Sequence, residues 1–181
     1  MYEVSIGAIV LAIIVIAAAL SATRKYRAYL TGYWSAHPDF AKAANISEFQ
    51  LFIAPPDPGT QISPGYLIIA DTVGAPTTNQ PIELTIEPSS ITDTMGAFYS
   101  TFASQDEFEG LMDINYAPAK SGLAAASALP SKLRFSLSMQ TGTLTLYSVT
   151  AATPGKVYAC LVKDLVTSEV ALRAYAAKPT P

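Results

Sequence analysis

Few side chains in this sequence belong to the types that carry out catalysis. His37 is the only histidine and Cys160 is the only cysteine. A lone histidine excludes a histidine-based zinc site, and any pair of a nucleophile and a histidine would have to use this residue beside Pro38. We interpret His37 as a side chain at a helix entry or at membrane headgroup level. Cys160 lies in the apolar run 157–162 and is interpreted as a small core residue.

The carboxylates are not arranged for metal binding or for acid/base catalysis. Glu83 and Glu87 share one face of an expected strand but stand about 13 Å apart, which is too wide for a catalytic pair. The densest acidic group lacks the alternating order of a calcium loop. It comprises Asp106, Glu107, Glu109 and Asp113. The sequence therefore predicts no enzyme, with no catalytic, cofactor-binding or metal-binding residue and no small-molecule substrate.

The net charge and the fraction of charged residues indicate which kinds of partner the chain could bind. The chain of 181 residues has a net charge of −3, which argues against nucleic acid because phosphate binding needs a basic surface. Only 14% of the residues are charged, whereas a free soluble domain carries about a quarter. We expect a surface that is covered by neighbouring subunits.

The N-terminal segment is apolar and uncharged from Val4 to Thr23. A helix of about 20 residues spans roughly 30 Å, the thickness of a hydrocarbon core. The pattern predicts a transmembrane anchor rather than a cleaved signal peptide, since the first residues are acidic and Leu20 stands where a cleavage site needs a small residue. The predicted lipid-facing residues are Ile6, Ile9, Ile13, Ile16 and Leu20.

Basic and aromatic residues follow this segment. Arg24, Lys25 and Arg27 predict a single-pass protein with its N-terminus outside and its C-terminal domain in the cytosol. Two interpretations of Tyr26, Tyr29 and Trp34 are equally compatible with the sequence: an aromatic belt at the membrane flank, or packing against the domain's own sheet.

The remainder predicts a mainly β fold, with an antiparallel sandwich or barrel and jelly-roll-like or Greek-key connections. Alternating apolar residues between proline and glycine turns mark the strands. We expect an anchor with its basic flank at 1–31, an aromatic linker and short helix at 32–47, a β domain at 48–175 and an extended tail at 176–181. Candidate strands are 49–54, 66–71, 82–87, 97–102, 111–116, 133–140, 143–150, 157–163 and 169–174.

Three long loops, 55–64, 72–81 and 117–131, are candidates for contacts with partners, with tolerated insertions as an equal alternative. Pro58, Thr78 and Ser121 represent them.

Several short motifs of the N-terminal half resemble membrane-anchored minor capsid proteins of large icosahedral double-stranded DNA viruses of the algal-virus kind. They are Gly32-Tyr33-Trp34, Pro38-Asp39-Phe40, the segment 49–54 and the segment 65–69, all after the apolar segment. The resemblance implies a structural protein that tethers a capsid shell to an internal lipid membrane. Its expected partners are a lipid bilayer and other capsid subunits, and its expected location is the virion, between inner membrane and capsid.

Two other functions remain open. A pilin-like filament subunit would place the apolar helix in a fibre core, although the chain has Ser5 where such subunits carry a glutamate. A cytosol-facing membrane adaptor module is also compatible with the sequence.

Overall fold

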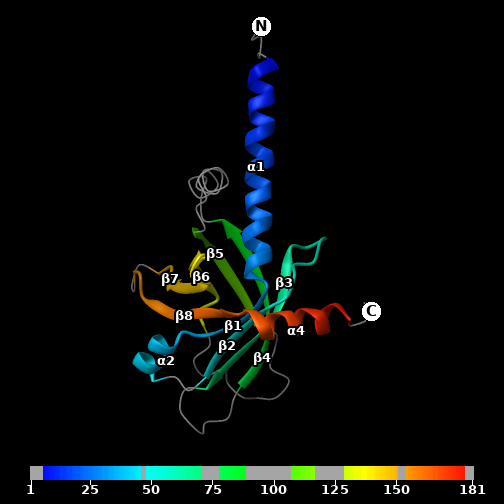
Figure 1. Cartoon of the computed structure of the whole chain (residues 1–181). Coiled ribbons are helices and arrows are strands. Elements are labelled where there is room, and N and C mark those ends of the chain that lie inside the picture. Colours follow the sequence, from blue (N-terminus) through cyan, green and yellow to red (C-terminus); the bar gives the residue numbers. More distant parts are fainter. Residues whose placement is uncertain are drawn as a thin grey trace.

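The structure, a computed structural model, describes residues 6–45, 48–70, 78–88, 107–116, 129–150 and 154–177. Figure 1 shows a long helix standing on a strand domain. The helices are α1 (Ile6–Leu30), α2 (Pro38–Ala44) and α4 (Leu165–Ala176). The strands are β1 (Gly32–Ala36), β2 (Glu48–Ile53), β3 (Ile62–Ala70), β4 (Thr78–Pro88), β5 (Glu107–Tyr116), β6 (Lys132–Ser138), β7 (Thr143–Ser148) and β8 (Val157–Asp164).

The strands form a closed antiparallel barrel in which each strand pairs with its neighbours in sequence. The short strand β1 closes it, since Trp34 stands opposite Leu51 of β2 on one side and opposite Lys163 of β8 on the other. Closure leaves no free sheet edge among these strands, so their backbone groups are paired all the way round.

Alternation of buried and more exposed side chains along most strands fills the barrel. In β6, Leu133, Phe135 and Leu137 are buried, whereas Lys132 before them and Arg134 between the first two are exposed. The same period holds in β5 and β7. Because side chains of a strand point to opposite faces in turn, this pattern fixes one apolar face inside the barrel.

Gly110 makes room for the largest of these core side chains. It points into the barrel from β5 opposite Phe135, and a Cβ atom there would lie 2.6 Å from the Phe135 ring and 2.6 Å from the carbonyl oxygen of Glu87. A glycine is required here because both the ring and the neighbouring backbone approach this position closely.

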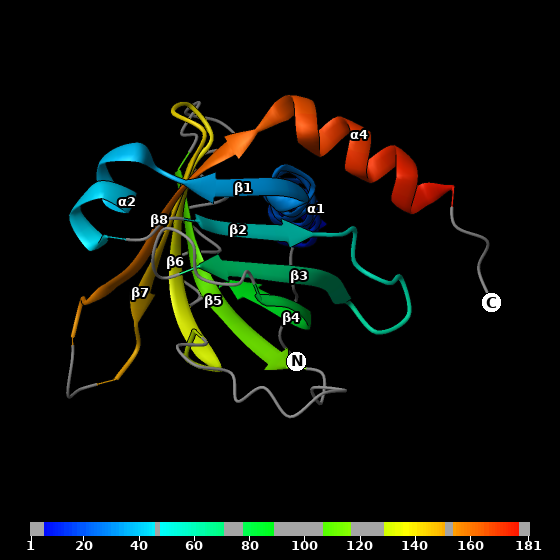
Figure 2. The ribbon, with the colours of Figure 1, turned by 90° about the horizontal axis from the view of Figure 1, so that it is seen from below.

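The two shorter helices lie outside the barrel. Helix α2 begins at the N-cap His37, whose Nδ1 accepts a hydrogen bond from the Asp39 N–H, and ends at Asn45 in the left-handed region. Helix α4 begins at the N-cap Asp164, which accepts from Thr167 N–H, and it packs on β1 through the buried Ser168. Figure 2 shows α4 beside β1, with α1 seen end-on.

Several predictions about the β domain are corrected. The connections are those of a simple meander, not of a jelly roll or Greek key, because every strand pairs with its sequence neighbours. The segment predicted as a strand at 169–174 lies in α4, where the Asp164 cap and the Glu169–Arg173 pair one turn apart support a helix. Residues 32–36, predicted as a linker, form β1. The predicted strand 97–102 lies outside the described residues.

The predicted membrane anchor is also corrected. Within the described residues, no helix is both long enough and apolar enough to cross a membrane. The last turn of α1 instead belongs to the protein core, where Tyr26 and Leu30 are buried. The transmembrane helix and the single-pass localisation predicted from Ile6, Ile9, Ile13, Ile16 and Leu20 are therefore contradicted.

Gly110→Ala should lower the free energy of unfolding by about 1 to 3 kcal/mol, because the new methyl group overpacks the core against Phe135. Urea denaturation followed by circular dichroism measures the change. The control is Gly59→Ala, where the nearest atom to the new Cβ is the Asp57 carboxylate at 3.2 Å in an exposed turn. Equal stability of the two variants would show that the barrel interior can relax around the added methyl group.

Candidate functional site

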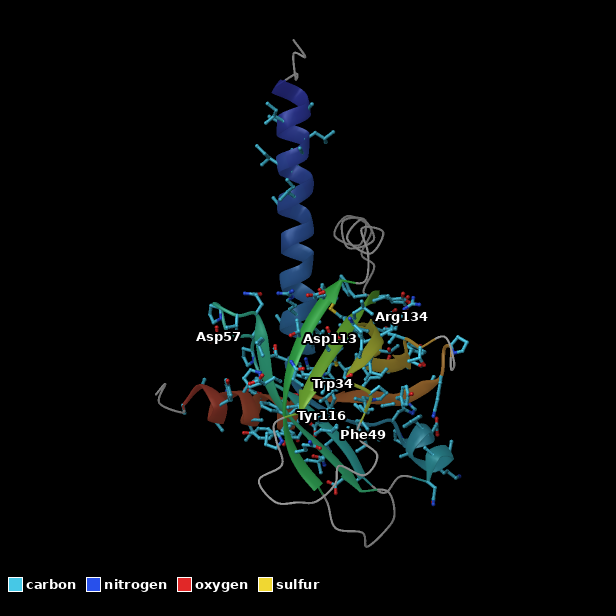
Figure 3. The ribbon with its side chains drawn as sticks, turned by 180° about the vertical axis from the view of Figure 1, so that it is seen from behind. Trp34, Phe49, Asp57, Asp113, Tyr116 and Arg134 are labelled. Atoms are coloured by element: carbon cyan, nitrogen blue, oxygen red, sulfur yellow. The ribbon has the colours of Figure 1, made fainter. Side chains whose placement is uncertain are left out.

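The largest group of exposed apolar side chains among the described residues belongs to the part of α1 that extends away from the barrel, residues 6–20, which we call the stalk (Figure 1). Its large side chains stand out from the helix in several directions (Figure 3). Leu11, Ile13 and Ile16 are 63%, 60% and 59% exposed. Ile9, Val10 and Ile14 are about half exposed. Such a contiguous apolar surface marks a site of interaction.

The last turn of α1 occupies the mouth of the barrel. Tyr26 and Leu30 are buried in the same apolar cluster as the strand residues. The ring of Tyr26 packs against Phe108 of β5 with 5.2 Å between centroids. Burial raises the pKa of Tyr26, and the neighbouring Arg27 partly offsets this effect.

Each of the last four carbonyl groups of α1 accepts a hydrogen bond. The Thr31 N–H donates to Arg27 O at 3.3 Å, and the Thr31 hydroxyl donates to Ala28 O at 2.7 Å. The Lys163 ammonium donates to Tyr29 O, and the Trp34 indole N–H donates to Leu30 O at 2.8 Å. A helix end leaves these four groups without intrahelical partners, so their pairing allows the end to be buried.

Lys163 reaches the helix end from inside the barrel. It follows Ala159 and Leu161 on the inward face of β8, and its Nζ lies 4.2 Å from the ring centroid of Tyr29 and 5.3 Å from that of Trp34. Burial lowers the pKa of Lys163 to about 8. A cation at this place interacts favourably with the negative end of the helix dipole and with the aromatic faces.

Two further contacts attach the helix to the rim. Arg27 donates to the Gln61 side chain at 2.6 Å and to the Ile86 carbonyl at 3.1 Å. On another side, the Tyr29 hydroxyl donates to Met139 O at 3.2 Å. A small hollow beside Arg27 belongs to this junction and is also lined by Thr31, Gln61 and Ser63. The last turn is therefore held at several points around the barrel mouth.

Of the residues predicted at the membrane flank, some contact the strand domain at this junction and others lie before it in α1. Tyr26, Arg27, Tyr29 and Trp34 all pack against the protein's own strand domain, and Trp34 is fully buried. Arg24 and Lys25 lie one turn earlier in α1. Of the two interpretations of Tyr26, Tyr29 and Trp34, packing against the domain's own strands is therefore the one that fits their position.

The other candidate residues have structural partners or lie apart. His37 caps α2, which confirms its interpretation as a helix-entry residue. The Cys160 sulfur is 3.9 Å from the Thr145 hydroxyl in a partly buried site. Glu109 and Asp113 pair with Arg134 and Lys132 on the outer face of the barrel. In the part of the chain that the structure describes, no cluster of three or more histidine, cysteine, aspartate or glutamate residues could hold a metal ion.

The three residues chosen for the loops are not brought together. Pro58 is exposed in the turn between β2 and β3, where the Asp57 carboxylate accepts from the N–H groups of Gly59 and Thr60. These bonds hold the pKa of Asp57 below its usual value. Thr78 is the first residue of β4, and Ser121 lies outside the described residues.

Sequence reasoning missed Lys163. Its signal was an ionisable residue at an inward position of a strand whose other inward residues are apolar, in the order Ala159, Leu161, Lys163. An ionisable residue at such a position needs a specific partner. Nothing in the sequence indicates that this partner is a helix end more than a hundred residues away.

Comparisons with protein-family models, with curated proteins and with solved structures find no match for this chain.

Trp34→Phe should lower the free energy of unfolding by about 1 to 3 kcal/mol. The change removes the indole N–H and leaves the Leu30 carbonyl at the buried end of α1 without its donor. Urea denaturation followed by circular dichroism measures the loss. Tyr33→Phe is the control because Tyr33 lies next to it on the outer face and bonds to Ser168 through its backbone only. Equal losses in both variants would contradict a special role of the indole.

The titration of Lys163 should make the free energy of unfolding depend on pH. Its pKa is about 8 in the folded protein against 10.5 for an unperturbed lysine, so between these values the unfolded chain binds more protons. The folded state therefore gains stability as the pH rises through this range. The free energy of unfolding of the parent, minus that of Lys163→Met, should increase from about pH 7.5 to 9.5. A difference that falls with pH would show that the folded state favours the charged amine.

Proposed function

We propose that this chain is a structural subunit of a larger protein assembly, a minor component of an icosahedral capsid shell, that uses its stalk to pack against other protein subunits. The observation that carries the proposal is that the apolar stalk extends away from the barrel, while the last turn of the same helix is buried in the barrel mouth. Its biochemical role is to hold subunits together rather than to turn over a substrate.

The exposure of the stalk supports an assembly role because apolar side chains in contact with water cost free energy. Burial of one large aliphatic side chain contributes about 1.5 to 3 kcal/mol, and the stalk leaves half or more of several such side chains in contact with solvent. A protein that worked alone would gain stability by keeping these side chains in its core. Their exposure therefore favours a partner that covers them.

The junction supports the same role because it prepares the stalk for binding. The capped and buried last turn orients α1 before any partner is present. A preorganised element loses less conformational entropy on association, so more of its burial energy appears as affinity.

The resemblance to minor capsid proteins supports the type of assembly. Its motifs lie at structurally important positions: Gly32-Tyr33-Trp34 forms the strand that closes the barrel, and Pro38-Asp39-Phe40 begins α2. The role proposed here is contact with other protein subunits.

A filament subunit is the second candidate. It is favoured by the same separation of an apolar helix from a strand domain, which would place helices in a fibre core and barrels on the outside.

Deletion of residues 7–17 should abolish incorporation into particles while leaving the barrel folded, because Tyr26 to Leu30 and all strands remain. The test is density-gradient fractionation of assemblies from cells that make the other shell subunits together with the tagged full chain or the deletion variant. We expect the full chain with icosahedral particles and the variant in the light fractions, with unchanged thermal unfolding. Electron microscopy of the peak fractions distinguishes shells from filaments. A full chain found only in the light fractions would refute the assembly role.

A further inference from the structure

The junction between α1 and the barrel contains buried polar atoms without partners. The Arg27 Nε–H and the Tyr26 hydroxyl make no hydrogen bond to any group of the described residues. Tyr26 as a whole is only 3% exposed, and its hydroxyl lies close enough to Arg27 for the guanidinium charge to act on it. Because a buried donor without an acceptor costs free energy, two of them at one place indicate an acceptor that is not part of this chain.

The positive charge of Arg27 is also unmatched. Its two terminal nitrogens donate to the Gln61 side-chain oxygen and to the Ile86 carbonyl, which are both neutral acceptors. Among the residues that the structure describes, no carboxylate forms an ion pair with Arg27. Asp57, the acidic residue of the turn that includes Gln61, accepts from two backbone N–H groups of its own turn instead. A partly buried guanidinium that meets only neutral groups favours a negatively charged guest.

The hollow beside Arg27 limits the size of this guest. It lies between the last turn of α1, the end of β2, the start of β3 and β4, and its cavity volume is about 10 Å³. This volume suffices for the centre of one water-sized guest, so a single ion fits and an organic anion does not.

Ser63 supplies a further donor in this hollow. It is 4% exposed and lies on the inward face of β3, where the next inward residues, Gly65 and Leu67, carry no polar side chain. Its side chain lines the hollow together with Arg27. A buried hydroxyl at an otherwise apolar set of positions needs a polar partner.

From these groups we propose that the hollow is a binding site for one halide ion, with chloride as its ordinary occupant, held by the Arg27 Nε–H and the Ser63 hydroxyl and assisted by the Tyr26 hydroxyl. This site goes beyond the assembly role and does not depend on it.

A halide fits these groups better than a water molecule does. Arg27, Ser63 and Tyr26 all have protons to donate, and a halide accepts each of them. A water molecule has two protons of its own that also need acceptors, and it leaves the charge of Arg27 without a counterion.

The negative end of the α1 dipole offers little opposition to the ion. The four carbonyl groups at this end are already paired, and Lys163 places a second cation at the barrel mouth. The site combines a helix with strands far apart in the sequence, so the unfolded chain lacks it. Bound halide therefore stabilises the folded state.

The test is thermal unfolding of the full chain at constant ionic strength, with chloride or bromide replacing gluconate, an anion too large for the hollow. The unfolding midpoint should rise by about 2 to 4 °C once the halide concentration reaches several times its Kd. Arg27→Gln should remove this rise. Arg173→Gln is the matched control, because it removes the same charge from an exposed arginine of α4 that pairs with Glu169, and it should keep the rise.

Ser63→Ala is a milder second variant, since it leaves the guanidinium and its two neutral partners in place, and it should make the rise smaller. It decides the question if Arg27→Gln does not fold, because an undiminished rise in Ser63→Ala would then overturn the proposal. A parent midpoint that does not rise with halide would assign the hollow to water. An equal rise in the parent and in Arg27→Gln would also overturn the proposal, since a general salt effect acts on both.

Discussion

Burial of the C-terminal turn of α1 in the barrel mouth is the constraint on which the other features depend. A helix end can enter an apolar core only if its carbonyl groups are paired, and here Thr31, Lys163 and Trp34 supply all the donors. The donors come from the residue after the helix, from the first strand and from the last strand. The cap therefore joins the strands that close the barrel to the helix that leaves it.

This arrangement ties closure to helix position. Trp34 is at once a residue of the closing strand β1, a buried core side chain and the donor to Leu30 O. Lys163 stands opposite Trp34 in β8 and donates to the preceding carbonyl of the helix, Tyr29 O. Removal of one donor would leave a carbonyl group of the helix end unpaired in the barrel mouth, and an unpaired buried polar group costs free energy of folding. A rigid joint of this kind gives the stalk a defined direction, which a flexible linker would not provide.

A defined direction matters because the stalk carries its apolar side chains outward. The barrel buries its own apolar face within a closed wall, so its strands offer no free edge for pairing. Association through the described part of the chain therefore depends on side-chain surfaces, and the stalk carries more exposed large apolar side chains than any other element of that part.

The sequence by itself determined most strands, through the period-two alternation seen in Leu133, Phe135 and Leu137, and it determined the continuous apolar helix and the cap of α2 at His37. These features are local, since they depend on residues a few positions apart. Only the tertiary structure decided the meander topology, the helical state of 165–176, the role of β1 and the position of Tyr26, Tyr29 and Trp34 in the core. Lys163 and Tyr29 are separated by more than a hundred residues, and no local period reports such a contact. Whether an apolar helix lies in lipid, in a core or in an interface depends on what surrounds it, and that is a property of the fold.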